Sequence, residues 1–136
     1  MPVPGFNPIR WDCEQQGCFN KLCRPKLEIF AECFPGKMAM SDIDGIVEIG
    51  GRYLMLEWKN EWDGKVIHVD TARRIMYERV TADGDFVVYV VAGNAQTMEV
   101  WASSKFEHGK RQPTVQESLS SLKVKFMAWA HMVRSV

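Results

Sequence analysis

Residues 41–59 read SDIDGIVEIGGRYLMLEWK, and they decide the architecture that we expect for this chain. Two runs rich in β-forming residues stand on either side of Gly50 and Gly51. Both glycines can adopt a positive φ without steric cost, which favours a two-residue turn between antiparallel strands. The stretch therefore predicts a β-hairpin in which Ile49 pairs with Arg52.

The same register places charged residues next to one another at the open end of the hairpin. Counting outward from the turn puts Asp44 opposite Glu57, and Asp42 opposite Lys59. Side chains alternate between the two faces of a strand, so all four point to one face. Three carboxylates repel one another unless a cation compensates them. Magnesium or manganese is the expected cation, because both prefer oxygen ligands.

The predicted elements outside the hairpin are helices and strands around one core. An irregular arm over residues 1–19 comes first, and a polar, basic loop over 103–113 precedes the last helix. The apolar run at 86–92 is typical of a strand covered on both faces. In chain order we expect a helix at 20–33, the hairpin, a helix at 71–80 capped by Asp70, strands at 86–92 and 97–102, and a helix at 114–134. The sequence thus predicts a single α+β domain over 1–136, with helices flanking a central mixed sheet.

The start of the last helix is predicted from a capping box at Thr114 and Glu117, in which the two side chains satisfy free backbone N–H groups. Its apolar residues have helical spacing and share one face. They are Val115, Leu119, Leu122, Phe126, Trp129 and Val133. Two interpretations of this face stay open, of which closing the core ranks before contact in a homodimer.

Composition excludes several classes of protein. The 136 residues are 46% hydrophobic and 25% charged, which is typical of an ordinary globular domain. No apolar run approaches the roughly 20 residues that cross a bilayer. The start, MPVPGFNPIR, does not resemble a signal peptide, so we expect a cytoplasmic location. Seventeen basic and seventeen acidic residues cancel, so binding of nucleic acid would depend on a local site.

The four cysteines do not predict a metal site. Their spacing is C-x4-C-x4-C-x9-C, which lacks the C-x2-C pairs of zinc ribbons, and no histidine is near. Disulfides are not expected in a cytoplasm. We interpret some of these residues as buried small hydrophobes and others as exposed thiols. The cysteines are Cys13, Cys18, Cys23 and Cys33.

The pattern Asp44-(x12)-Glu57-Trp58-Lys59 resembles the motif of the PD-(D/E)XK nuclease superfamily. The resemblance covers about residues 20–102 and is greatest to small phage-encoded nucleases and Holliday-junction resolvases. It implies a restriction-endonuclease-like core, with the motif on the hairpin. It also implies that Asp44, Glu57 and the carbonyl of Trp58 hold Mg²⁺ or Mn²⁺. Lys59 would then orient or help to deprotonate the attacking water and neutralise charge on the phosphate.

Accessory roles follow from the same resemblance. Ile43 stands where the literal motif has a proline, in the loosest part of the family pattern. Asp42 is interpreted either as a ligand of a second metal ion or as an ion-pair partner of the motif lysine. Glu28 is either an accessory acidic ligand or a solvated helix residue. Of Arg73 and Arg74, one is expected to face the site or the phosphates, and a surface position is the alternative.

Other candidates lie outside the motif. Lys105, Lys110 and Arg111 belong to a basic stretch that could contact the phosphate backbone of DNA, although such stretches are often only solvated. Trp62 is expected either to stack on a base or to pack against a partner. His68 lies in an apolar Val-Ile-His-Val run and is interpreted as structural.

The sequence favours a metal-dependent nuclease that hydrolyses phosphodiester bonds in DNA, acting as a homodimer or recognising DNA structure. One alternative is a catalytically silent protein of the same fold that binds a host factor or nucleic acid. Another is a structural network of salt bridges in an unrelated α+β domain. The joint presence of Asp44, Glu57 and Lys59 favours the enzyme, because a silent protein has little need of all three.

Overall fold

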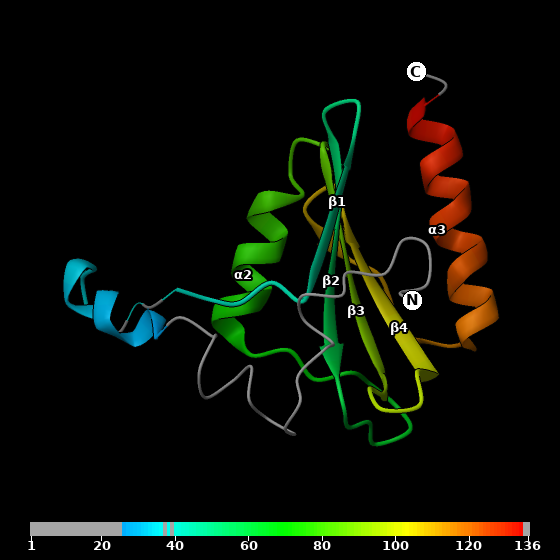
Figure 1. Ribbon diagram of the computed structural model, residues 1–136, viewed down its shortest axis with the longest axis horizontal. Helices are drawn as coiled ribbons and strands as arrows, with labels where there is room; N and C mark the ends of the chain where they lie inside the picture. The colour runs from blue at the N-terminus through cyan, green and yellow to red at the C-terminus, as the bar shows by residue number, and fades with distance from the viewer. Residues whose placement is uncertain (1–25, 37, 39, 135–136) are drawn as a thin grey trace, which may run out of the picture. The chain divides into compact units, whose positions relative to one another are not determined.

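The computed structural model describes residues 26–134 with the exception of positions 37 and 39 (Figure 1). The chain divides into two compact units, Met1–Asp42 and Ile43–Val136. Each unit is described by itself. The expectation of a single domain over the whole chain stays a prediction.

In the first unit, the described residues form one short helical element. It is the 3-10 helix η2 (Leu27–Cys33), where the sequence predicts a helix at 20–33. None of its residues is buried. Cys33 has an exposed, free thiol, which is one of the two states expected for the cysteines. The arm at 1–19 and the other three cysteines lie outside the described residues.

The second unit is a six-stranded mixed sheet with a long helix on each face. Figure 1 shows α2 (Thr71–Val80) on one face and α3 (Leu119–Arg134) on the other. The strands are β1 (Gly45–Ile49), β2 (Arg52–Lys59), β3 (Phe86–Asn94), β4 (Glu99–Glu107), β5 (Lys110–Arg111) and β6 (Val115–Gln116). Their order is β1-β2-β3-β4-β5, and β6 also pairs with β4. Only β2 and β3 are parallel among these pairs of described strands, and the predicted α+β class with a mixed sheet is confirmed.

The hairpin of β1 and β2 has the predicted turn and register. Ile49 pairs with Arg52, and Gly50 and Gly51 have φ values of 58° and 82°. The carboxylate of Glu48 accepts a hydrogen bond of 2.7 Å from the N–H of Gly51. Positive φ at both central positions is what a two-residue turn of this kind requires, and glycine adopts it at little cost.

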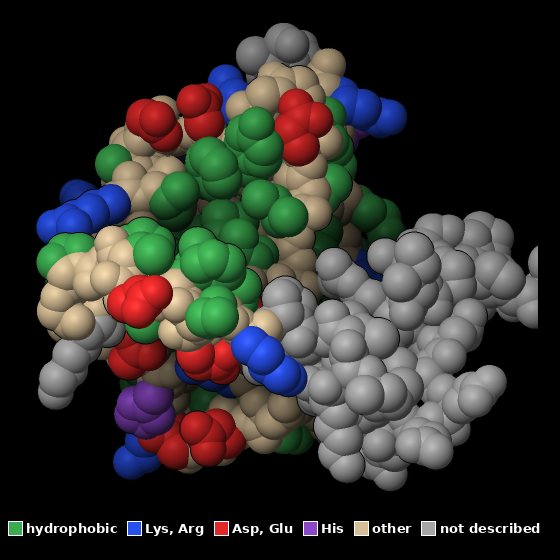
Figure 2. Space-filling view, turned by 60° about the vertical axis from the view of Figure 1, so that its left-hand side comes forward, with side chains coloured by type: hydrophobic (Ala, Val, Ile, Leu, Met, Phe, Trp, Pro, Cys, Tyr) green, Lys and Arg blue, Asp and Glu red, His purple; other side chains and the backbone are tan. Residues whose placement is uncertain are grey.

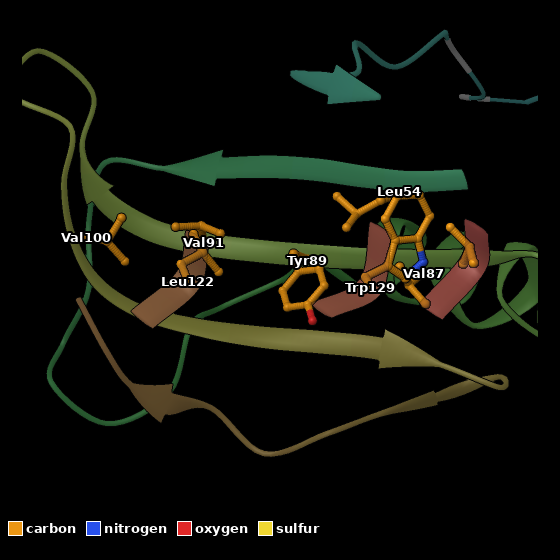
Figure 3. Packing of buried hydrophobic residues seen from close by; sticks show 8 residues of the cluster. Leu54, Val87, Tyr89, Val91, Val100, Leu122 and Trp129 are labelled. Atoms are coloured by element: carbon orange, nitrogen blue, oxygen red, sulfur yellow. The ribbon is translucent and has the colours of Figure 1, made fainter. Parts of the chain in front are cut away.

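Strand β3 is covered on both faces, as its apolar sequence predicts. Val90 and Val91 follow one another in the strand, point to opposite faces and are both fully buried. Burying a side chain of this size contributes about 1.5–3 kcal/mol. Figure 3 shows the cluster on the α3 face, and its labelled residues are Leu54, Val87, Tyr89, Val91, Val100, Leu122 and Trp129. The second cluster, on the α2 face, includes Met55, Ile67, Tyr77, Val88, Val90 and Phe106.

Helix α3 begins at Leu119 and not at Thr114. Ser118 caps the helix, because its Oγ accepts a hydrogen bond of 3.2 Å from the N–H of Ser121. Thr114 instead accepts a hydrogen bond of 3.2 Å from the N–H of Ile67. The capping box therefore does not form, and the segment between Thr114 and the helix is strand β6 and its connection. The later part of the predicted stripe does face the core, with Leu122, Trp129 and Val133 buried. Neither α3 nor any other helix in the described part of the chain is long and apolar enough to span a bilayer.

Strand β4 is longer than predicted, because it continues through two polar residues to Glu107. Ser103 and Ser104 were expected in a loop but are buried in the sheet. The hydroxyl of Ser104 donates to the carbonyl of Gln112 over 2.9 Å, and that of Ser103 donates to the carboxylate of Glu117. A buried hydroxyl with a partner carries little penalty, so polarity here does not indicate exposure.

Hydrophobic side chains are also exposed on the second unit. They include Ile46 and Val47 of β1, an edge strand of the sheet, and Met76 of α2. Figure 2 shows hydrophobic side chains gathered over one area of the surface, with acidic side chains at its margins.

Gly93 is expected to tolerate no side chain. It follows the register shift in β3, and a Cβ there would lie 2.2 Å from the carbonyl oxygen of Glu99 and 2.9 Å from the ring of Trp58. Gly93→Ala should therefore lower the free energy of unfolding by about 1–3 kcal/mol in urea titrations. Gly45→Ala is the matched control, because its Cβ would meet Leu56 at an ordinary 3.6 Å, and it should change stability by less than about 0.5 kcal/mol. Equal effects would contradict the close approach at Gly93.

Candidate active site

The candidate site lies where β2 ends, on the sheet face that α2 covers. Strand β1 begins at Gly45, and its pairing with Leu56 places the preceding Asp44 opposite Glu57. Glu57 and Lys59 are two residues apart in β2 and share a face. The ammonium Nζ of Lys59 lies 3.7 Å from Oε1 of Glu57. The structure thus brings together three of the four charged residues that the hairpin register predicts, Asp44, Glu57 and Lys59. Asp42 belongs to the first unit, so its predicted place opposite Lys59 stays a prediction.

Asp44 contacts β2 through a backbone group. Its Oδ2 accepts a hydrogen bond of 2.6 Å from the N–H of Trp58. In an antiparallel pair, the N–H and C=O of one residue point to the same neighbouring strand, so the carbonyl of Trp58 also points to the side of Asp44. The indole of Trp58 belongs to the cluster on the α3 face, and its Nε1 donates to Oδ1 of Asn60 over 3.2 Å.

Glu57 is a buried residue, and its side chain is only 8% exposed. The guanidinium of Arg73 donates a hydrogen bond to Oε1, and the hydroxyl of Tyr77 donates one to Oε2. These two donors are four residues apart on α2 and so lie on one face of the helix. Asp70 caps this helix, as predicted, by accepting a hydrogen bond of 2.9 Å from the N–H of Arg73. The negative charge of Glu57 is therefore compensated within the protein, by Arg73 and the nearby Lys59.

The protonation states of the donors follow from their surroundings. Burial raises the pKa of Tyr77 well above its ordinary value, and the hydrogen bond to Glu57 and its charge raise it further. Burial lowers the pKa of Arg73, but the charge of Glu57 and the hydrogen bond to it outweigh this effect, so the pKa is raised. At neutral pH, Tyr77 is a neutral donor and Arg73 is a cation.

The oxygen atoms at the site fit a divalent cation in chemical type. Asp44 and Glu57 supply carboxylates, and Trp58 supplies a backbone carbonyl, which are the ligands that Mg²⁺ and Mn²⁺ prefer. Among the described residues, no three or more His, Cys, Asp or Glu side chains form a group that could hold a metal ion. Both carboxylate oxygens of Glu57 already accept hydrogen bonds. A cation that binds Oε1 of Glu57 therefore competes with the guanidinium of Arg73 for the same oxygen.

The predicted accessory residues occupy different places. Arg74 makes an ion pair with Glu78 on α2, at 3.0 Å, so Arg73 is the arginine that faces the site. Glu28 lies in the first turn of η2, and Asp42 is an exposed residue of the same unit. Their roles at the site stay predictions.

The structure does not bring the predicted DNA-contacting basic residues together. Lys105 lies on the α3 face, with its Nζ 5.7 Å from the ring centroid of Tyr89. Arg111 donates to the carbonyl of Ile67 on the α2 face, and burial lowers its pKa. Lys110 is the exposed first residue of β5. Contacts of these residues with DNA stay predictions.

Tyr77 is the residue that the sequence analysis missed. It is the buried residue of α2 and supplies one of the two hydrogen bonds from this helix to Glu57. A signal was present in the sequence, since Tyr77 follows Arg73 by one helical turn. This spacing indicates that Tyr77 contacts Glu57 only once Arg73 is known to face the sheet.

Comparisons of the chain with protein-family models, with curated proteins and with solved structures give no match. The candidate site therefore depends on the chain's own residues and their geometry.

Tyr77→Phe is expected to destabilise the protein by about 1.5–3 kcal/mol, because it removes a hydrogen bond to a buried charge and leaves the ring in place. Urea unfolding at neutral pH measures this change. Tyr53→Phe is the matched control, since Tyr53 stacks on Phe86 and its hydroxyl makes no hydrogen bond with a described residue. A Tyr77→Phe protein as stable as the control variant would show that the hydroxyl does not support Glu57.

Proposed function

We propose that this chain hydrolyses phosphodiester bonds in DNA with a divalent cation, Mg²⁺ or Mn²⁺. The observation that carries the proposal is the grouping at the end of β2. Asp44 directly precedes the neighbouring strand β1 and stands opposite Glu57, and the ammonium of Lys59 lies 3.7 Å from Glu57. Two carboxylates beside one ammonium suit a reaction that brings an anionic phosphate, a cation and a water molecule together.

Each residue has a role in the proposed reaction. Asp44, Glu57 and the carbonyl of Trp58 would hold the cation, which, when bound, polarises the phosphate and lowers the pKa of a bound water molecule. Lys59 donates hydrogen bonds to a phosphate oxygen or to the attacking water. Arg73, once released from Glu57, binds a second phosphate oxygen, since a guanidinium has several donors in a fixed plane.

The order of elements supports the proposal. The hairpin that carries the motif is followed by α2 and then by β3, which is parallel to β2. This is the order that the resemblance to small PD-(D/E)XK nucleases implies. Cytoplasmic DNA as the substrate belongs to the same proposal. A homodimer as the active form also belongs to it, because one small site cuts one strand at a time.

A catalytically silent binding protein is the second candidate function. It is favoured by the hydrogen bonds from α2 to both carboxylate oxygens of Glu57, which form a complete arrangement without a cation. Such a protein would use the same fold to bind nucleic acid or a host factor.

A cleavage panel tests the two functions against each other. The panel contains linear duplex, single strand, flap and four-way junction, each with Mg²⁺ or Mn²⁺ and with EDTA. We expect cation-dependent cleavage that is slowed by about 100-fold or more in Lys59→Ala, because a charge-stabilising donor is lost. Lys123→Ala removes an exposed lysine from α3 and should cleave as the unaltered protein does. No cleavage of any substrate by folded protein would overturn the enzyme and favour the silent binding protein.

Cation binding can be measured without cleavage. Terbium emission sensitised by tryptophan reports an ion near Trp58, and Arg73→Gln should tighten binding by roughly fivefold, as expected for removal of an ion pair worth about 1 kcal/mol. Arg74→Gln is the matched control, because it removes the same charge from the same helix but its partner is Glu78. Equal affinities of the two variants would show that the ion does not replace Arg73 at Glu57.

A further inference from the structure

A hollow lies beside the candidate active site, where the chain leaves β2. Its volume is about 340 Å³, near the lower end of the range for ligand sites and close to the size of one nucleotide. We call it the Trp62 pocket, and it is lined by Lys59, Glu61, Trp62, Asp63 and His68. Lys59 borders both the pocket and Glu57, so the two sites adjoin.

We propose that the Trp62 pocket binds one unpaired base of a DNA strand whose phosphate lies at Lys59. This inference rests on the proposed function and names the class of substrate. A base that is paired in a duplex cannot enter a side pocket, whereas a base in a single strand, a flap or a branch point can. The substrate is therefore DNA with at least one unpaired nucleotide next to the cleaved bond.

Trp62 supplies the surface on which the base stacks. Its ring packs against the cluster on the α2 face, which fixes its position. Its indole N–H is buried and has no hydrogen-bond partner among the described residues. That N–H is shielded from solvent, so what Trp62 offers a ligand in the pocket is the face of its indole ring. Every base has a flat ring that can stack on such a face.

The other wall of the pocket is polar and acidic. Nε2 of His68 lies 2.9 Å from Oδ2 of Asp63, and Oδ1 of Asp63 accepts hydrogen bonds from the N–H groups of Lys65 and Val66 at 2.8 and 3.0 Å. The hydrogen bond from His68 lowers the pKa of Asp63. Carboxylates accept hydrogen bonds from the amino groups of cytosine and adenine and repel phosphate. Glu61 adds a second carboxylate to the lining, so Lys59 is the lining residue that attracts the phosphate.

Binding without a cation tests the pocket separately from catalysis. The probe is a short, fluorescently labelled oligodeoxycytidylate in EDTA, and the readout is anisotropy with the full chain. Trp62→Ala should weaken binding by about 5- to 150-fold, which corresponds to the loss of one stacked base. Trp62→Phe should restore most of the affinity, because it keeps a ring. Trp101→Ala is the matched control and should bind as the unaltered protein does, and affinity for a blunt duplex should be unchanged in all variants.

A crosslinking experiment on the unaltered chain keeps the inference testable if Trp62→Ala fails to fold. The probe carries a single 5-iododeoxycytidine, and mass spectrometry locates the crosslink after irradiation. A crosslink at Trp62 or His68 supports the pocket, and crosslinks only elsewhere overturn it. Equal binding by folded Trp62→Ala also overturns it, whatever the cleavage panel shows. Binding that depends on Trp62 without any cleavage would leave the pocket in place and remove the proposed nuclease.

Discussion

The parallel pairing of β2 and β3 is the constraint on which the rest of the second unit depends. Two parallel neighbours cannot be joined by a tight turn and need a crossover that passes over one face of the sheet. Here the crossover contains α2, so that helix covers one face and leaves the other to α3. Arg73 and Tyr77 reach Glu57 because the crossover places one side of α2 above β2. The geometry of the candidate site is therefore a consequence of strand pairing.

Glu57 connects the stability of this fold with its proposed chemistry. A charged carboxylate that is almost fully buried needs partners, and α2 provides a cation and a hydroxyl while β2 provides Lys59 nearby. The same oxygens that α2 binds are those that a cation would need. The proposed chemistry would thus weaken part of a stabilising network, which is the usual trade-off between stability and activity. Asp44 differs, since its contact is with a backbone N–H and leaves α2 undisturbed.

Features set by local chemistry could be read from the sequence. The hairpin register follows from Gly50 and Gly51, and the start of α2 from Asp70, because each depends on residues within one turn. The start of α3 could not be read in this way. Thr114 and Ser118 are both suitable helix caps. The side chain of Thr114 accepts a hydrogen bond from the N–H of Ile67, which is distant in the sequence, and Ser118 therefore caps the helix. The buried serines of β4 were likewise misread, because their partners lie on other segments.

The two faces of β2 differ in their contacts, and this difference explains how the candidate active site and the Trp62 pocket can share Lys59. Alternate residues of the strand anchor it, since the ring of Trp58 is packed in the α3 cluster while Glu57 and Lys59 point to the opposite face. The loop that follows is also fixed, because Oδ1 of Asn60 accepts hydrogen bonds from Nε1 of Trp58 and from the N–H of Ala95. Lys59 therefore lies between a packed strand and an anchored loop. A nucleotide bound there as proposed would meet a surface formed before binding, which would lower the ordering cost of recognition.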